Sequence, residues 1–279
     1  MGIISSIFKQ YSDEYLERYG ARMPSNHRKV IKAIRTCRTS ACGMNHYSCE
    51  NGDYNHTVYR GCGNRHCPNC QQARSEQWLS KRLSEQLPGP HFLVTFTVPA
   101  ELRPLLRSHQ RDGYTALFEA SSQALKELAG DMRLVGGDLP GFFGVLHTWG
   151  RQLSYHPHIH YVIPGGAVCR KSKRWMPSHE KYFAPTGALS KLVRGKFRDA
   201  MKARGLYGEI PLEVWGKSWT VDSQALGANT SGALKYLAPY VFRVAISDSR
   251  IVRFEHRQVT FRYRDSETNE ECIMTLEVM

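Results

Sequence analysis

Three histidines stand at every second position of one short segment, "SYHPHIHYVIPGG" at residues 154–166. Because the side chains of a strand alternate between its two faces, His158 and His160 would share one face while Ile159 points into the core. Two imidazoles on one face can bind one metal ion, which would either activate a water for hydrolysis or polarise a scissile phosphate. His156 precedes a proline, which disfavours regular pairing and puts it at the strand entrance. The pattern also fits polar positions on an exposed strand, so its meaning depends on residues elsewhere.

A pair of tyrosines four residues apart, Tyr236 and Tyr240, lies in "SGALKYLAPYVFRVAIS" at residues 231–247. Positions i and i+4 lie on one face of a helix, so both phenols could reach the same phosphate. Lys235 and Arg243 are near enough in the sequence to bind that phosphate. Tyrosines at this spacing are more often core residues, so the pair gains meaning only in combination with other features.

Six of the eight cysteines fall within residues 37–70. In a reducing compartment such clustering indicates metal binding before disulfides. The thiolates of Cys67 and Cys70, two residues apart, can bind one side of a tetrahedral zinc ion. The candidates for the other side are Cys49 with Cys62 or His46 with Cys49, and the further candidates are Cys37, Cys42, His56 and His66. One structural zinc is expected, and the number of candidates would allow two.

The elements that carry these residues divide the chain at the "PGP" of residues 88–90. Residues 1–88 have helical patterns before and after the cysteines, which predicts a small helical zinc-binding domain. Residues 89–279 alternate strand patterns, such as 91–99 and 158–164, with amphipathic helices. This order predicts an α+β fold in which an antiparallel sheet has helices on one side.

The charge balance favours an anionic partner, with 38 Lys+Arg against 25 Asp+Glu and a formal net charge of +13. Nucleic acid is the leading candidate, because basic side chains bind its phosphates and release counterions. Arg65 and Arg74 lie among the cysteines and tyrosines of the N-terminal segment, where they suit a contact with DNA. No run of about 18 apolar residues occurs, so we expect a cytoplasmic protein without a membrane partner.

In combination, these segments resemble the rolling-circle transposases of insertion sequences, which belong to the HUH superfamily of single-stranded DNA endonucleases and use two tyrosines. The resemblance covers nearly the whole chain in family order. It rests on the blocks "CRTSACG", "GCGNRHCPNCQ", "FLVTFTVPAELR", "LHTWGRQLSYHPHIHYVIPGG", "LSKLVRGKF" and "YLAPYVFRVAIS".

The resemblance implies an RRM-like catalytic sheet, with His158 and His160 as ligands of Mg²⁺ or Mn²⁺. It implies that Tyr236 and Tyr240 are the nucleophiles that attack single-stranded DNA at the transposon ends. The products would be a 5′-phosphotyrosine and a free 3′-hydroxyl, and the stored ester bond makes ATP unnecessary for rejoining.

The resemblance also implies a third metal ligand, for which the nearby candidates are Gln152 and His156. The chain departs from the family at Pro239, which lies between the tyrosines and predicts a kink in their helix. It departs again at Gly52, where many relatives have another cysteine. Family members usually continue beyond "IMTLEVM", so the catalytic domain is expected to be truncated at its C-terminus.

Other function classes remain as alternatives. One is a plasmid or phage replication initiator of the same superfamily, although the N-terminal cysteine-rich segment supports this alternative less well. Another is a non-catalytic protein that contains zinc and only binds DNA. A zinc hydrolase of a small substrate is the least favoured, because its substrate would not require the basic charge.

Overall fold

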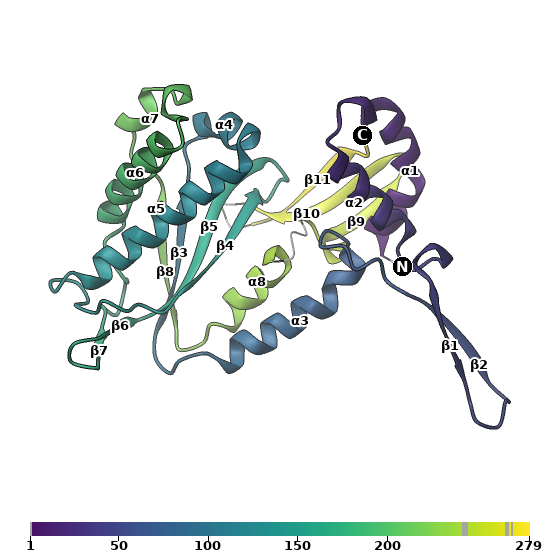
Figure 1. The fold of residues 1–279 in the computed structure, drawn as a ribbon, viewed down its shortest axis with the longest axis horizontal. Helices are drawn as coiled ribbons and strands as arrows, with labels where there is room; N and C mark the ends of the chain where they lie inside the picture. Colours follow the sequence, from purple (N-terminus) through teal and green to yellow (C-terminus); the bar gives the residue numbers. More distant parts are fainter. Residues whose placement is uncertain (1, 242–244, 266–267, 269) are drawn as a thin grey trace. The chain divides into compact units, whose positions relative to one another are not determined.

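The computed structural model describes residues 2–241, 245–265, 268 and 270–279, which form two compact units (Figure 1). Unit 1 comprises residues 1–81, 151–153 and 238–279, and unit 2 comprises residues 82–150 and 154–237. Arg243, one of the predicted DNA-binding residues, lies outside the described residues.

Unit 2 is built around a four-stranded antiparallel sheet with the strand order β4-β5-β3-β8. Along the chain its elements follow the order β3-α5-β4-β5-α6-β8. This is the βαββαβ arrangement of RRM-like domains, so the predicted α+β fold with an RRM-like sheet is confirmed. The elements are β3 (His91–Thr97), α5 (Gln110–Gly130), β4 (Phe143–Trp149), β5 (Tyr155–Pro164), α6 (Thr186–Ala203) and β8 (Val221–Gly227).

Alternation along β3 and β5 decides which side chains meet the helices. Phe92 and Phe96 of β3 and Ile159 of β5 are fully buried in one core with apolar residues of α5 and α6. Each such side chain contributes about 1.5–3 kcal/mol when it leaves water. The hydroxyl of Tyr161 on β5 also lies 2.8 Å from Oγ of Ser121 on α5. The helices therefore cover one face of the sheet, and the alternate residues, such as Thr95 and His160, face the other side.

Shorter elements surround the sheet of unit 2. They are α4 (Arg103–Ser108), the hairpin of β6 (Gly166–Cys169) and β7 (Arg174–Pro177), α7 (Glu213–Gly216) and the first part of α8 (Ser231–Val241). Helix α8 contains Pro239 and continues to Val241, so the proline does not end it.

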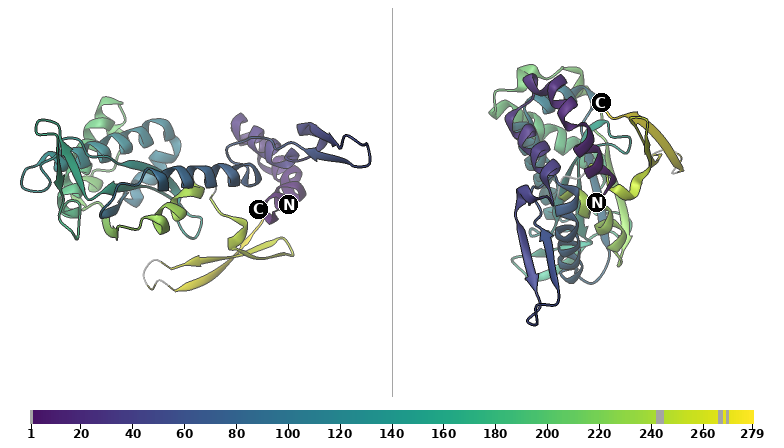
Figure 2. Two further views of the ribbon diagram at one scale, coloured as in Figure 1. Left: turned by 90° about the horizontal axis from the view of Figure 1, so that it is seen from below. Right: turned by 90° about the vertical axis from the view of Figure 1, so that its right-hand side faces the viewer.

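Unit 1 contains α1 (Ile3–Tyr19), α2 (Ser25–Thr36), most of α3 (Pro68–Ser84) and two small antiparallel sheets. One sheet is the hairpin of β1 (Met44–Ser48) and β2 (Asn55–Tyr59), which is exposed along both strands and extends away from α1 and α2 (Figure 2). The other has the order β11-β10-β9 and consists of β9 (Ile251–Glu255), β10 (Gln258–Arg264) and β11 (Glu271–Glu277).

Contacts between the two ends of the chain hold unit 1 together. The Ile4 N–H donates to Oδ1 of Asp248 at 2.8 Å, and the rings of Tyr11 and Phe254 meet edge to face at 6.0 Å. The compact units thus cut the chain differently from the predicted consecutive domains, residues 1–88 and 89–279. That division by sequence stays a prediction.

Within the described part of the chain, no helix combines the length and the apolar composition that crossing a membrane requires.

Candidate functional site

Three histidine side chains meet on the face of the unit 2 sheet that lies opposite the helices. His147 of β4 pairs directly with His158 of β5, and His160 follows two residues later on the same face. Their potential ligand atoms all lie within 4.8 Å of one another, and all three side chains are buried. We refer to these three residues as the histidine group.

Hydrogen bonds at one ring nitrogen orient two of these imidazoles. Nδ1 of His158 lies 2.7 Å from the backbone carbonyl oxygen of His156, and because a carbonyl can only accept, this nitrogen carries the proton. Nδ1 of His160 lies 2.7 Å from Oγ1 of Thr95, while its buried Nε2 has no hydrogen-bond partner among the residues that the structure describes. Histidines that bind metals are oriented in this way through the nitrogen that does not bind the ion. The Nε2 atoms are thus suited to hold a metal ion.

Burial keeps the histidine group uncharged at neutral pH. It lowers the pKa of His158 to about 4 and that of His160 to about 3, mainly because a charged imidazole is poorly solvated there. Burial lowers the pKa of His147 as well, and the neighbouring His160 and His158 add to the effect. A metal ion requires neutral imidazoles, so the environment provides the ligands in the state that binds.

Tyr236 of α8 lies beside the histidine group within unit 2. Its ring centroid is 5.7 Å from that of His147 and 5.7 Å from that of His160. The side chain is 41% exposed, so the phenol is accessible from solvent while it borders the buried imidazoles. Tyr240 lies on the same helix but belongs to unit 1, where it lines a cavity whose lining includes none of the three histidines.

Neither residue suggested as a third metal ligand belongs to the histidine group. Nη2 of Arg103 lies 2.7 Å from Nδ1 of His156, and since the guanidinium only donates, this nitrogen accepts. Gln152 belongs to unit 1, where its Nε2 lies 3.3 Å from the hydroxyl of Tyr263. The ring centroid of His156 is 5.2 Å from that of His158, but His156 is not among the three residues whose ligand atoms converge.

The sequence analysis missed His147, which the structure brings to the site. It lies in a segment with a strand pattern, "GFFGVLHTW" at residues 141–149. A hairpin between this segment and the histidine strand would have suggested the pairing of His147 with His158, but only its register decides which side chains share a face.

Four cysteine sulfurs form a second candidate metal centre, in unit 1. They belong to Cys37, Cys62, Cys67 and Cys70, which we call the cysteine group, and all lie within 4.8 Å of one another. The sulfur of Cys70 is 3.4 Å from that of Cys37 and 3.8 Å from that of Cys62. A tetrahedral zinc with Zn–S bonds of about 2.3 Å would hold its sulfurs about 3.8 Å apart. The spacing therefore fits one zinc ion.

Local structure explains how these four residues converge. Cys37 follows the end of α2, and Cys67 immediately precedes α3. A Cβ atom at Gly61 would lie 2.9 Å from the Cys70 sulfur, so a larger residue there would displace that sulfur. Burial raises the pKa of the Cys67 thiol to about 11. A bound cation would offset that penalty by stabilising the thiolates.

The other predicted zinc ligands lie outside the cysteine group. Cys49 is exposed at the end of β1, and His46 lies on the same exposed strand with Nδ1 2.8 Å from Oγ1 of Thr57. The cysteine group also does not include three further predicted zinc ligands, Cys42, His56 and His66.

Of the predicted DNA-binding residues that the structure describes, Lys235 lies in unit 2, and Arg65 and Arg74 lie in unit 1. Lys235 is exposed on α8, and Arg74 is exposed on α3. Nη2 of Arg65 donates to the backbone carbonyl of Val241 at 3.3 Å within unit 1.

Comparison with known proteins relates the chain to transposases over most of its length. A protein family described as "Transposase zinc-binding domain" matches residues 7–98, and one described as "Putative transposase" matches residues 141–279. "Putative transposase y4qJ" of Sinorhizobium fredii is 31% identical over 280 residues, covering 94% of this chain and 70% of that protein. "Transposase for insertion sequence element IS801" of Pseudomonas savastanoi pv. phaseolicola is 26% identical over 256 residues, covering 86% of this chain and 61% of that protein. No solved structure matches significantly.

We expect Cys37→Ser to reduce the zinc content of the purified protein from one ion per chain to well below one, because it removes one of four converging sulfurs. Inductively coupled plasma mass spectrometry measures the content. Cys49→Ser is the matched control and should retain the ion, since Cys49 lies outside the cysteine group. Equal zinc loss in both variants would contradict this ligand set.

We expect His147→Ala to abolish Mn²⁺ binding by zinc-loaded protein, as followed by electron paramagnetic resonance. Thr95→Val should weaken that binding by about 10–100-fold, because the orienting partner of His160 is lost. The control His179→Ala changes an exposed histidine of the same unit, which stacks on Tyr182, and should bind Mn²⁺ normally. Unchanged binding by His147→Ala would remove this residue from the metal site.

Proposed function

The chain belongs to the family of rolling-circle insertion-sequence transposases with an N-terminal zinc-binding domain, and we propose that it nicks and rejoins single-stranded DNA at transposon ends through a 5′-phosphotyrosine. The chain spans 70% and 61% of the two relatives' lengths, so the activity of the whole protein is part of this proposal.

The observation that carries the proposal is the position of Tyr236 beside the histidine group. A phenol 5.7 Å, ring to ring, from two imidazoles suited to bind a metal could attack a phosphate at that metal. The side chain is 41% exposed, so DNA can approach it from solvent.

In the proposed reaction, the Tyr236 phenol loses its proton to solvent and its oxygen bonds to the phosphorus. The bond from phosphorus to the 3′ oxygen of the preceding nucleotide breaks, and that oxygen takes up a proton to become a 3′-hydroxyl. Rejoining is the reverse: a 3′-hydroxyl attacks the phosphotyrosine and releases the phenol. The number of phosphoester bonds is conserved in both directions, so no nucleotide triphosphate is needed.

His147, His158 and His160 would hold the divalent ion that the proposal requires. When bound there, the ion supplies positive charge that polarises the phosphate. Imidazole ligands favour first-row transition metals over Mg²⁺, so of the two expected ions we favour Mn²⁺.

The remaining roles follow from the same proposal. Tyr240 would serve as a second nucleophile, which allows a second strand transfer before the first strand is released. Lys235, Arg74 and Arg65 would contact the DNA backbone, and the zinc ion of the cysteine group would stabilise the domain that carries the last two.

We expect Tyr236→Phe to abolish formation of a covalent protein–DNA species, because the attacking oxygen is removed. The assay incubates the protein with Mn²⁺ and 3′-labelled single-stranded oligonucleotides from the transposon ends, and a denaturing gel detects the retained label. The control Tyr182→Phe changes a partly exposed tyrosine of the same unit and should form the adduct normally. An adduct in the double variant Tyr236→Phe, Tyr240→Phe would refute a tyrosine nucleophile at either position.

A further inference from the structure

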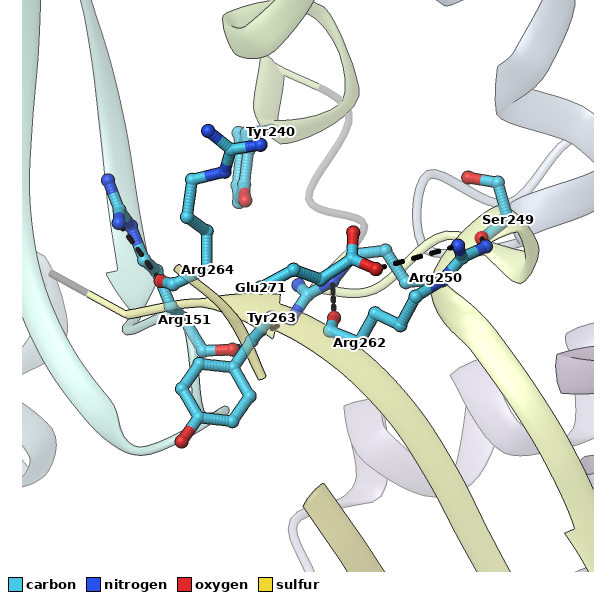
Figure 3. A pocket seen from close by; sticks show the side chains of 8 residues that line it. All are labelled: Arg151, Tyr240, Ser249, Arg250, Arg262, Tyr263, Arg264 and Glu271. Atoms are coloured by element: carbon cyan, nitrogen blue, oxygen red, sulfur yellow. Dashed lines mark hydrogen bonds and ion pairs between the residues drawn. The ribbon is translucent and has the colours of Figure 1, made fainter. Parts of the chain in front are cut away.

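A cavity of about 310 Å³ in unit 1 is lined by four arginines and by Tyr240 (Figure 3). Its walls come from β10 and β11, from the helical turn Asp248–Arg250 before β9, from the end of α8 and from Arg151 in the segment after β4. The full lining consists of Arg151, Tyr240, Ser249, Arg250, Arg262, Tyr263, Arg264 and Glu271. We call this the Tyr240 pocket.

The pocket concentrates positive charge. Its lining has four guanidinium groups and one carboxylate, and the nearest approach of Glu271 to Arg262 is 3.9 Å. An exposed ion pair at this distance contributes little. The pocket thus has a surplus of positive charge that an anion would offset.

Two of the arginines, Arg151 and Arg250, donate hydrogen bonds to backbone carbonyls of unit 1. Nη1 of Arg151 donates to the backbone carbonyls of Arg264 at 2.9 Å and Asp265 at 2.8 Å. Nε of Arg250 donates to the carbonyl of Arg262 at 2.9 Å, and its Nη2 donates to the carbonyl of Arg151 at 2.7 Å. These bonds tie the segment after β4 to β10 and fix the frame of the pocket.

The other two arginines, Arg262 and Arg264, have N–H donors that are available to a ligand. Arg262 and Arg264 are two residues apart on β10, so their side chains leave the same face of the strand, and both are exposed. Nη2 of Arg262 makes one long bond, 3.4 Å, to the carbonyl of Ser249. The guanidinium of Arg264 has no hydrogen bond or ion pair with any described residue, and its side chain points into the same space as that of Tyr240 (Figure 3).

We propose that the Tyr240 pocket binds a phosphodiester of single-stranded DNA, with Arg262 and Arg264 as its contacts. Guanidinium groups bind phosphate oxygens through paired hydrogen bonds. The volume exceeds that of a lone phosphate and falls in the range of ligand pockets, about 300–1,000 Å³. Tyr240 adds aromatic surface on which a base can stack.

This inference rests on the proposed function only in taking single-stranded DNA as the substrate. It adds a binding site in unit 1 to the histidine site in unit 2. A strand held in the pocket would present its phosphate near the phenol of Tyr240, the residue proposed as the second nucleophile.

The test measures equilibrium binding of a fluorescein-labelled single-stranded oligothymidine to the full chain by fluorescence anisotropy, without Mn²⁺ and at several salt concentrations. We expect Arg264→Gln to weaken binding roughly tenfold at low salt. The slope of log K against log[salt] should fall by about 0.7 for one lost phosphate contact, and by about twice that in Arg262→Gln, Arg264→Gln. Arg264→Lys should recover part of the loss, because it keeps the charge without the paired donors.

Arg253→Gln is the matched control. It removes the same charge from the neighbouring strand β9, outside the pocket, where Arg253 pairs with Glu255. An equal loss of affinity and slope in Arg264→Gln and Arg253→Gln would overturn the inference, because general charge would then explain the binding. So would unchanged binding in the double variant.

The two proposals fail in distinguishable ways. If wild-type protein forms no covalent adduct but the pocket variants still lose phosphate contacts, the nicking proposal fails and the pocket stands. If the adduct forms normally and the double variant binds oligothymidine like Arg253→Gln, the pocket inference fails and the nicking proposal stands.

Discussion

The pairing register of β4, β5 and β3 is the constraint on which the candidate active site depends. His147 lies opposite His158, and Thr95 lies opposite His160, so one metal-binding set and its orienting hydroxyl share a face. A slip by one residue would turn the histidines toward the helices and Ile159 toward solvent. The hydrophobic core on the helix side therefore selects the register that assembles the histidine group. Stability and site geometry have the same origin here.

The cysteine group, if it binds zinc, stabilises a part of unit 1 that has little hydrophobic core. Its surrounding core is small, with Ile34 as the buried aliphatic residue beside Cys37 and Cys67. A structural zinc ion can contribute the free energy that such a segment lacks. The same unit joins the first helices to the last strands, which brings the Tyr240 pocket and the zinc-binding segment into one compact unit.

The local patterns predicted much of the fold and less of the sites. Period-two alternation at residues 91–99 and 158–164 and the helical period of α5 and α6 sufficed for an α+β fold with an antiparallel sheet, and the family resemblance added its RRM-like arrangement. The sequence offers Cys37 only as one of four further zinc ligands; it lies 25 residues before Cys62, and only folding brings the two together. His147 was missed for the same reason, since strand register is not a local property. Arg151 lies 99 residues before Arg250, so composition revealed the charge of the Tyr240 pocket but not the convergence of its arginines.

The most direct test of the account is to identify the residue that becomes linked to DNA. Wild-type protein would be incubated with Mn²⁺ and a transposon-end oligonucleotide, digested with protease and nuclease, and analysed by tandem mass spectrometry. The account predicts a nucleotide attached to the peptide that carries Tyr236, and its loss when His147 is replaced by alanine. Attachment at a residue outside α8, or undiminished attachment in that variant, would contradict the account.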